Sequence, residues 1–248
     1  MKISIITVVY NNVKTIRTAI ESVLKQSYNN IEYIIIDGAS NDGTIDIINE
    51  YRDKIALIIS DKDDGIYDAM NKGIKKATGN IIGILNSDDI YENNKILEIV
   101  ATEFINNNDL DALYGDLVYV TKDDISRIVR KWISCEYDKT FFERGEVPPH
   151  PALFLKNKVY LIAGLFNLDF KLASDYELMI RIFKKFNFKS KYINKVFVRM
   201  RLGGATNKSF KNIYLGNIEI IKAWKKNDLN LPFLFIPKRI LKRITQFL

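Results

Sequence analysis

Short, β-branched apolar segments recur through the first hundred residues of this chain, and they constrain its fold more than any other feature. Each is followed by a segment whose apolar residues have helical spacing, and they cover residues 3–10, 31–36, 55–59 and 81–85. Strands that are apolar on both faces are typical of parallel sheets buried under helices. The alternation therefore predicts an α/β fold, with a mostly parallel central sheet, flanking helices and right-handed crossovers.

The second half of the chain continues this pattern less regularly. The helices expected in the first half cover residues 15–26, 44–51, 66–77 and 96–104. Beyond residue 110 we expect strands at 112–120, 128–133 and 191–200, and helices at 174–186 and 208–224. The 248 residues contain no convincing linker, so the second half is expected to pack against the first.

Cysteine and histidine are too scarce for several classes of site. The single cysteine, Cys135, excludes a disulfide framework, and the single histidine, His150, excludes a multi-histidine metal centre. No apolar run approaches the roughly 20 residues that span a bilayer. The apolar run at the N-terminus is too short for a signal peptide. We therefore expect a cytoplasmic protein.

Charge is distributed unevenly along the chain. Residues 181–248 carry 17 Lys and Arg against two acids, a net charge of +15, and residues 1–180 carry −8. A uniformly basic nucleic-acid binder would not show this division, so no nucleic-acid partner is expected. The acidic part favours a cation site, and the basic end favours contact with a phosphate or a membrane surface.

Polar clusters follow the four predicted strands of the first half, at residues 7–11, 37–44, 61–64 and 86–89. Ligands of open parallel sheets bind beyond the carboxyl ends of the strands. One such cluster alone is most often a loop of turn formers, but four at the same edge predict a binding site. The chain has no GxGxxG after its first strand and no GxxxxGK[ST], which argues against a dinucleotide-binding domain and a P-loop.

Adjacent carboxylates at Asp88 and Asp89 are the most informative of these polar residues. Two neighbouring negative charges repel unless a positive group lies beside them. A hard divalent cation, Mn²⁺ or Mg²⁺, fits, and it would take its other ligands from substrate phosphates. The alternative is that these residues are a helix N-cap with an acidic first turn, ahead of the helix that begins at Ile96. The two roles are compatible.

Five ordered motifs identify a family resemblance. They are TVVYNN at 7–12, IDGASNDGT at 36–44, DDGIYDAMNKGI at 63–74, NSDD at 86–89 and ASDYELMIR at 173–181. Together they resemble the family 2 glycosyltransferases of the GT-A fold, nearest to the bacterial branch that builds O-antigen, capsule and colanic-acid-type polysaccharides. The resemblance implies a metal-dependent, inverting transfer of a hexose or N-acetylhexosamine from a UDP-sugar to an acceptor hydroxyl.

The resemblance also divides the chain and assigns residues. Residues 1–110 would bind the nucleotide sugar, 111–207 would form the acceptor-binding half of the same GT-A domain, and 208–248 would form C-terminal helices. The residues implied in donor binding are Thr7, Val9, Tyr10 and Asn11 for the nucleoside, Asp37 for the uracil or ribose, and Asp63, Asn71, Lys72, Ser87 and Asp88 around the nucleotide and sugar. Asp88 and Asp89 match the metal motif, and Asp175 matches the general base.

Some positions depart from the family pattern. Val9 stands where proline is common, Gly38 where many members have a second aspartate, and Asn86 where the metal motif has its first aspartate. Asp175 also has a simpler interpretation from position alone, as the N-cap of its helix.

Further candidates lie later in the chain. Arg199 and Arg201, with the glycines Gly203 and Gly204, form a second possible phosphate contact, or else a plain turn with solvated arginines. His150, set between prolines, could face the acceptor or the metal, or be a turn residue without a catalytic role. Trp132 and Trp224 could stack on sugar rings, although core packing is favoured for both.

The C-terminal segment, residues 233–248, reads as a basic amphipathic helix. Ile240, Leu241, Ile244, Phe247 and Leu248 gather on one side, and Lys238, Arg239, Lys242 and Arg243 gather toward the other. Such a helix lies flat on an anionic leaflet. We therefore expect peripheral binding at the inner face of the cell membrane, where a lipid-diphosphate-linked saccharide would be the acceptor. The alternatives are a helix docked on the core and, for the whole chain, a non-catalytic nucleotide-sugar-binding or scaffolding subunit. No oligomeric state is predicted.

Overall fold

A mixed sheet runs through the molecule. The computed structural model describes residues 1–203 and 210–246. Within them the strands are β1 (Ile3–Val9), β2 (Ile31–Asp37), β3 (Leu57–Ser60), β4 (Ile81–Ile84), β5 (Asp89–Tyr91), β6 (Ala112–Val120), β7 (Ile128–Trp132), β8 (Leu153–Lys156) and β9 (Ser190–Arg201). Their order is β3-β2-β1-β4-β8-β6-β9-β5, with β7 paired to β6.

The first four strands form the predicted parallel part of the sheet. β1 lies between β2 and β4, and β3 pairs with β2, all in parallel. β8 then joins β4 and β6 antiparallel, and β6 pairs in parallel with β9. The sheet is therefore continuous from the first half of the chain into the second. The expected pair at 112–120 and 128–133 is confirmed as the antiparallel hairpin of β6 and β7.

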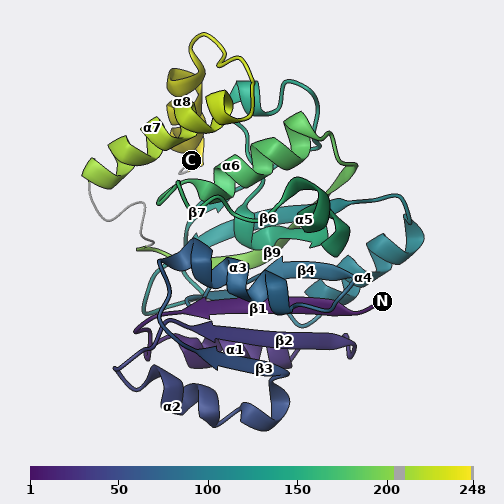
Figure 1. The fold of residues 1–248 in the computed structure, drawn as a ribbon, viewed down its shortest axis with the longest axis vertical. Coiled ribbons are helices and arrows are strands. Elements are labelled where there is room, and N and C mark those ends of the chain that lie inside the picture. Colours follow the sequence, from purple (N-terminus) through teal and green to yellow (C-terminus); the bar gives the residue numbers. More distant parts are fainter. Residues whose placement is uncertain (204–209, 247–248) are drawn as a thin grey trace.

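Helices cover both faces of the sheet (Figure 1). They are α1 (Ile16–Leu24), α2 (Thr44–Asn49), α3 (Ile66–Lys76), α4 (Ile96–Asn106), α5 (Asn157–Ala163), α6 (Ser174–Ile180), α7 (Phe210–Lys226) and α8 (Phe235–Thr245). Buried residues of α1, α2 and α4 pack in one core cluster. Those of α3, α5, α6 and α7, with Phe235 of α8, pack in the other. α7 and α8 lie at the opposite end of the molecule from β2 and β3.

Strand β1 shows why the sequence folds in this way. All seven of its residues are buried. Ile3 and Ile5 belong to one core cluster, and Ile6 and Val8 belong to the other. Burying one such side chain stabilises the fold by about 1.5–3 kcal/mol. The strand therefore needs helices on both sides, and its polar continuation at Tyr10 and Asn11 leaves the sheet at the edge where the ligand site was predicted.

No helix within residues 1–203 and 210–246 is long and apolar enough to cross a membrane.

Candidate active site

A cavity of about 640 Å³ opens at the carboxyl edge of the parallel strands. Its walls come from the ends of β1 and β4, the loop before α3, the start of α6, the β6–β7 hairpin, and α7 and α8. The predicted site residues that line it are Val9, Tyr10, Asn11, Asp63, Ser87, Asp88, His150, Asp175 and Gly203. The structure thus brings together residues from motifs up to 170 positions apart in the sequence.

Tyr10 and Asp63 form one end of the cavity. The Tyr10 ring is 65% exposed. A Cβ atom on Gly38 would lie 2.7 Å from Asp63 Oδ2 and 3.4 Å from the Tyr10 ring. A side chain at position 38 would therefore displace Asp63, which accounts for glycine at this departure from the family pattern. An exposed aromatic ring can stack on a nucleobase, and a carboxylate beside it can accept hydrogen bonds from the N–H groups of that nucleobase.

Thr7 and Asp37 lie behind this end and do not line the cavity. The Thr7 hydroxyl is hydrogen bonded to the Tyr33 hydroxyl at 3.1 Å, inside the sheet. The buried Asp37 carboxylate accepts hydrogen bonds from the hydroxyls of Ser40, at 2.5 Å, and Ser60, at 2.6 Å. Asp37 therefore holds the loops around the cavity, and its contact with the uracil or ribose stays a prediction.

Asn71 and Lys72 also turn away from the cavity. The buried Asn71 amide donates to the Phe166 carbonyl at 2.9 Å and accepts from the Phe166 N–H at 2.9 Å, so it ties α3 to the loop before α6. The Lys72 ammonium donates to the Lys62 carbonyl at 2.6 Å and pairs with Asp68 at 3.2 Å. Both side chains are occupied by the protein itself.

The two adjacent aspartates do not face the same way. Asp88 lines the cavity, whereas Asp89 begins β5 and is fully buried. The Asn86 amide donates to Asp89 Oδ2 at 2.9 Å. Burial raises the pKa of both carboxyls, and the charge of Asp88 raises that of Asp89 further. The predicted pair of metal ligands is thus divided, and Asp88 alone presents its carboxylate to the cavity.

A cation nevertheless fits this turn. The Oδ1 atoms of Asn86 and Asp89 are buried without a hydrogen-bond partner, so acceptor oxygens are in surplus next to Asp88. Among the described residues, no group of three His, Cys, Asp or Glu side chains could hold a metal. Mg²⁺ and similar ions are usually held by one or two carboxylates together with substrate phosphates. The donor set therefore suits an ion that arrives with a phosphorylated ligand.

Arg201 supports this turn from inside the protein. Its guanidinium donates to the Asp88 carbonyl at 2.7 Å and to the Thr18 hydroxyl at 3.1 Å. Arg199 forms a two-pronged contact with Glu92, at 2.7 and 2.8 Å. Neither arginine lines the cavity. Gly203 does, and Gly204 lies outside the described residues.

Asp175 lies in the first turn of α6, with Ala173 as the N-cap residue. The interpretation of Asp175 as a plain N-cap is therefore wrong. The Tyr67 hydroxyl donates to Asp175 Oδ1 at 3.1 Å. Burial and the Asp175 charge raise the pKa of Tyr67 well above its ordinary value, so Tyr67 stays a donor. A carboxylate held in this way, open to a cavity, can accept a proton from a hydroxyl group.

His150 lies beside this carboxylate. The rings of His150 and Tyr67 both pack on Phe166, with centroids 5.5 Å apart in each pair. Burial lowers the pKa of His150, and the charge of Asp175 acts in the opposite direction. His150 is therefore a cavity residue near Asp175, and its contact with the acceptor or with a metal stays a prediction.

Comparison with known proteins decides the family. A sequence model of glycosyl transferase family 2 matches residues 4–162, more than half of the chain. The chain belongs to glycosyl transferase family 2. It is 28% identical over 210 residues to a PGL/p-HBAD biosynthesis glycosyltransferase of Mycobacterium bovis, covering 82% of this chain and 78% of that one. It is 31% identical over 214 residues to an uncharacterized glycosyltransferase of Rickettsia prowazekii, covering 82% and 64%.

Solved structures agree on the fold. The structure of S. aureus TarS 1-349 in complex with UDP-GlcNAc superposes with a TM-score of 0.72 at 18% identity, over 99% of this chain and 73% of that one. The mannosyltransferase PcManGT from Pyrobaculum calidifontis, in complex with GDP-Man and Mn²⁺, gives 0.63 at 16% identity, over 97% and 73%. The GT-A fold predicted for this glycosyltransferase is thereby confirmed.

The two tryptophans of the glycosyltransferase differ in their surroundings. Trp224 is fully buried, and its indole N–H donates to the Tyr176 hydroxyl at 2.9 Å, so the packing prediction is confirmed. Trp132 instead lines the cavity, stacked on Tyr119 with a 3° angle between the rings. The sequence favoured core packing for both residues and did not separate them.

The C-terminal helix docks on the protein, and its predicted basic face is wrong in part. Phe235 is buried against Trp224, with ring centroids 5.4 Å apart. Arg239 donates to Asn217 Oδ1 at 3.0 Å, and Lys242 pairs with Glu146 at 2.6 Å, so both point inward. A Cβ on Gly145, at φ +83°, would lie 2.8 Å from Arg239 Cα, so glycine permits this close approach.

The outward side of α8 exposes apolar side chains beside Lys238. Ile240 and Leu241 are 47% and 63% exposed, and Phe233 and Leu234 before the helix are 89% and 53% exposed. Phe247 and Leu248, and the side chains of Arg243 and Ile244, lie outside what the structure describes.

Proposed function

We propose that this glycosyltransferase is an inverting enzyme that moves a hexose or N-acetylhexosamine from a UDP-sugar to an acceptor hydroxyl. One observation carries the proposal: Tyr10, Asp63, Asp88 and Asp175 line a single cavity. Tyr10 and Asp63 can bind the nucleobase of the donor. Asp88 can hold the metal ion that binds the diphosphate, and Asp175 can accept the proton of the acceptor hydroxyl. The TarS structures in complex with UDP and UDP-GlcNAc support a UDP-sugar donor, since they share this fold.

Asp175 is the proposed general base. A hydroxyl is a poor nucleophile at neutral pH, and a carboxylate within hydrogen-bond reach can take its proton as attack proceeds. Tyr67 keeps Asp175 oriented through the 3.1 Å hydrogen bond. The carboxylate removes the proton while the acceptor oxygen attacks the anomeric carbon. Because this attack displaces the nucleoside diphosphate in a single step, it inverts the configuration at that carbon.

Charge develops on the leaving nucleoside diphosphate. Mn²⁺ or Mg²⁺ bound beside Asp88 would supply the electrostatic stabilisation of this charge. Among the residues of the chain, Asp88 would hold the ion, while Arg201 fixes the backbone of the same turn. The metal requirement is part of the proposal, and the PcManGT complex with GDP-Man and Mn²⁺ supports it.

The acceptor that we propose is a lipid-diphosphate-linked saccharide of bacterial surface polysaccharide synthesis, such as O-antigen or capsule. The outward side of α8 supports it, because Phe233, Leu234, Ile240 and Leu241 are exposed next to a basic chain end. Apolar residues beside basic ones insert at the surface of anionic membranes. The enzyme would then work peripherally, at the cytoplasmic face of the cell membrane.

A donor screen tests the proposed function. UDP-Gal, UDP-Glc, UDP-GlcNAc and UDP-GalNAc are offered with Mn²⁺, and release of UDP is measured, with GDP-mannose as the control donor. We expect metal-dependent UDP release from at least one UDP-sugar and none of GDP from GDP-mannose. Failure of every UDP-sugar to bind, or preference for GDP-mannose, would overturn the donor assignment.

A further inference from the structure

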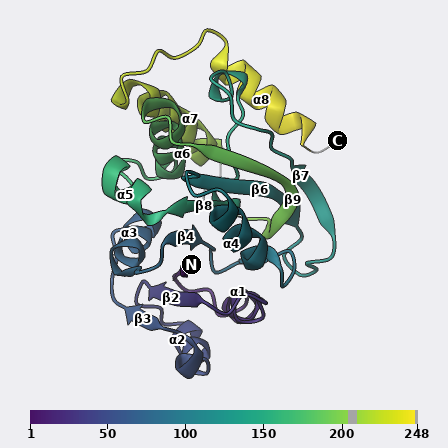
Figure 2. The same cartoon turned by 90° about the vertical axis from the view of Figure 1, so that its right-hand side faces the viewer.

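The cavity is lined by cationic side chains as well as by acids. Arg130 of β7, Lys171 of the loop before α6, and Arg239 of α8 all line it. Its acids, Asp63, Asp88 and Asp175, belong to the donor site and the proposed base. The two arginines come from neighbouring elements, since the C-terminal end of α8 points toward β7 (Figure 2). The cavity wall therefore carries three cationic side chains that the donor site and the proposed base do not use.

Arg239 lies beside α6, the helix that carries Asp175. Its side chain is 8% exposed, and its guanidinium donates to Asn217 Oδ1 at 3.0 Å and lies 6.0 Å from the centre of the Tyr176 ring. Tyr176 follows Asp175 in α6. A group bound by Arg239 would therefore lie next to the helix turn that presents the base.

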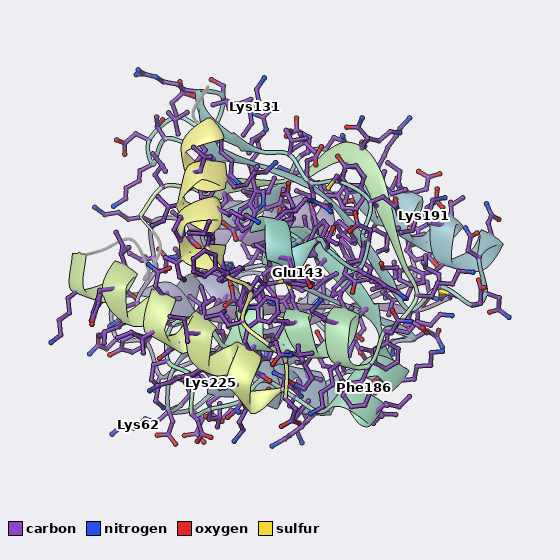
Figure 3. All side chains as sticks on the ribbon, turned by 90° about the horizontal axis from the view of Figure 1, so that it is seen from above. Lys62, Lys131, Glu143, Phe186, Lys191 and Lys225 are labelled. Atoms are coloured by element: carbon purple, nitrogen blue, oxygen red, sulfur yellow. The ribbon has the colours of Figure 1, made fainter. Side chains whose placement is uncertain are left out.

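Arg130 is held by the end of the same C-terminal helix. Its guanidinium lies over the Tyr119 ring, 4.5 Å from the centroid, and its Nε donates to Gln246 Oε1 at 2.9 Å. The Lys131 N–H donates to the Gln246 carbonyl at 3.0 Å, and Figure 3 shows Lys131 close to the end of α8. Gln246 follows Arg239 by seven residues, which is two helical turns or about 10 Å. α8 carries one guanidinium, and Gln246 at its end holds the other, so both lie along one wall of the cavity.

We propose that this wall, built around Arg239 and Arg130, binds the phosphate groups of a lipid-linked acceptor. The inference rests on the proposed function, because it concerns the second substrate of that reaction. Guanidinium groups recognise phosphate oxygens through paired, charge-assisted hydrogen bonds. A diphosphate spans several ångströms, so it can engage cationic groups spread along a wall. The site would hold the acceptor by its phosphates while its sugar hydroxyl reaches Asp175.

The outer side of α8 favours a lipid-linked phosphate over a free one. Ile240 and Leu241 follow Arg239 directly and are exposed. One helix therefore offers a guanidinium to the cavity and apolar side chains to the outside. That arrangement matches an amphiphile whose anionic group enters the cavity while its hydrocarbon chain stays at the surface.

Titration of the full-length protein with geranyl diphosphate tests the site. Saturating UDP and Mn²⁺ fill the donor region, so that binding elsewhere is measured calorimetrically. We expect geranyl diphosphate to bind beside UDP, inorganic pyrophosphate to bind more weakly, and geraniol not to bind. Arg239→Gln and Arg130→Gln should each weaken binding about tenfold or more, since each removes hydrogen bonds to a charged group.

Lys238→Gln is the matched control, because Lys238 is an exposed cation on the same helix that does not line the cavity. It should bind geranyl diphosphate as the wild type does. The proposal is overturned if geranyl diphosphate only displaces UDP, or if both arginine variants bind it normally. Equal affinity for pyrophosphate would overturn the lipid assignment.

Each variant is also titrated with UDP alone, which separates the two proposals. Normal UDP affinity with loss of geranyl diphosphate binding supports the acceptor site. If UDP does not bind the wild type at all, the donor proposal fails, while binding of geranyl diphosphate without UDP still tests Arg239. Should Arg239→Gln not fold, Arg130→Gln, at a half-buried strand position, decides the same question.

Discussion

At the scale of single residues, the turn after β4 makes the sharpest distinction in the site. Asp88 faces the cavity, and Asp89 is buried against Asn86. The sequence assigned both to the metal, because adjacent acids after a strand give no information about which side chain turns outward. Their different surroundings predict different consequences for the same conservative substitution.

Asp88→Asn should weaken Mn²⁺-dependent UDP binding about tenfold or more, since it removes the one carboxylate that the turn presents to the cavity. Asp89→Asn, the comparison variant, should change that affinity less, because residue 89 is turned inward and an asparagine keeps an Oδ1 acceptor there. Calorimetric titration of UDP with and without Mn²⁺ measures both. An equal loss in the two variants would contradict the division of roles.

His150 gives the stability of the protein a pH dependence of known sign. Burial lowers its pKa in the folded state, so the unfolded chain binds the proton more readily. Its contribution to stability is present above the ordinary histidine pKa, about 6.5, and is lost as the pH falls through the lower folded value. The free energy of unfolding of wild type should therefore fall between about pH 6.5 and 5 by more than that of His150→Gln.

Urea unfolding at several pH values checks this. His150 is the only histidine in the chain, so the difference between wild type and variant isolates its titration. Parallel curves for the two proteins across this range would show that Asp175 cancels the effect of burial.

Several residue assignments were beyond the reach of sequence. The motifs correctly indicated the strand ends, and Tyr10, Asp63, Asp88 and Asp175 do line the cavity. Sequence did not show that Arg201 would point inward to the Asp88 carbonyl. Tyr67 was missed although it stands inside a quoted motif, because its partner Asp175 lies 108 positions away in the sequence.

At the scale of elements, strong periodicity decided what was predictable. The first four strands and their helices were predicted closely, because apolar strand segments and segments of helical spacing alternate there. β5 has three residues and β8 has four, about as few as β3 and β4, but they stand outside that alternation, so nothing local marked them as strands. β8 nevertheless lies between β4 and β6, a placement set by long-range antiparallel pairing. The docking of α8 through Phe235 also depended on a distant partner, Trp224.

The two sides of α8 can be separated experimentally. Deletion of residues 233–248 would remove the buried Phe235 and so disturb the core. Phe233→Ser with Leu241→Ser changes exposed residues alone, and should reduce flotation with anionic vesicles while leaving the unfolding free energy within about 0.5 kcal/mol per site. Ile105→Ser serves as the control, because Ile105 is an exposed residue of α4, a helix whose buried residues belong to the other core cluster. Unchanged vesicle binding of the double variant would contradict a membrane role for this surface.

At the scale of the whole molecule, one continuous sheet makes both halves of the site. β4 passes to β8, β6 and β9, so the strand ends that carry Asp88 and the elements that carry Asp175 belong to one framework. The α/β class and the GT-A resemblance were predictable from alternation and motifs. The shared cavity was not, because its far wall comes from α7 and α8, whose packing no local pattern specifies.

The most direct test of this account is the substitution Asp175→Asn, measured for both UDP binding and transfer. The proposed function predicts that UDP affinity stays near that of wild type, because Asp175 is proposed to act on the acceptor hydroxyl, while turnover falls by roughly 10²-fold or more. Turnover equal to wild type would contradict the assignment of the base, and with it the proposal that this cavity joins a sugar donor to an acceptor hydroxyl.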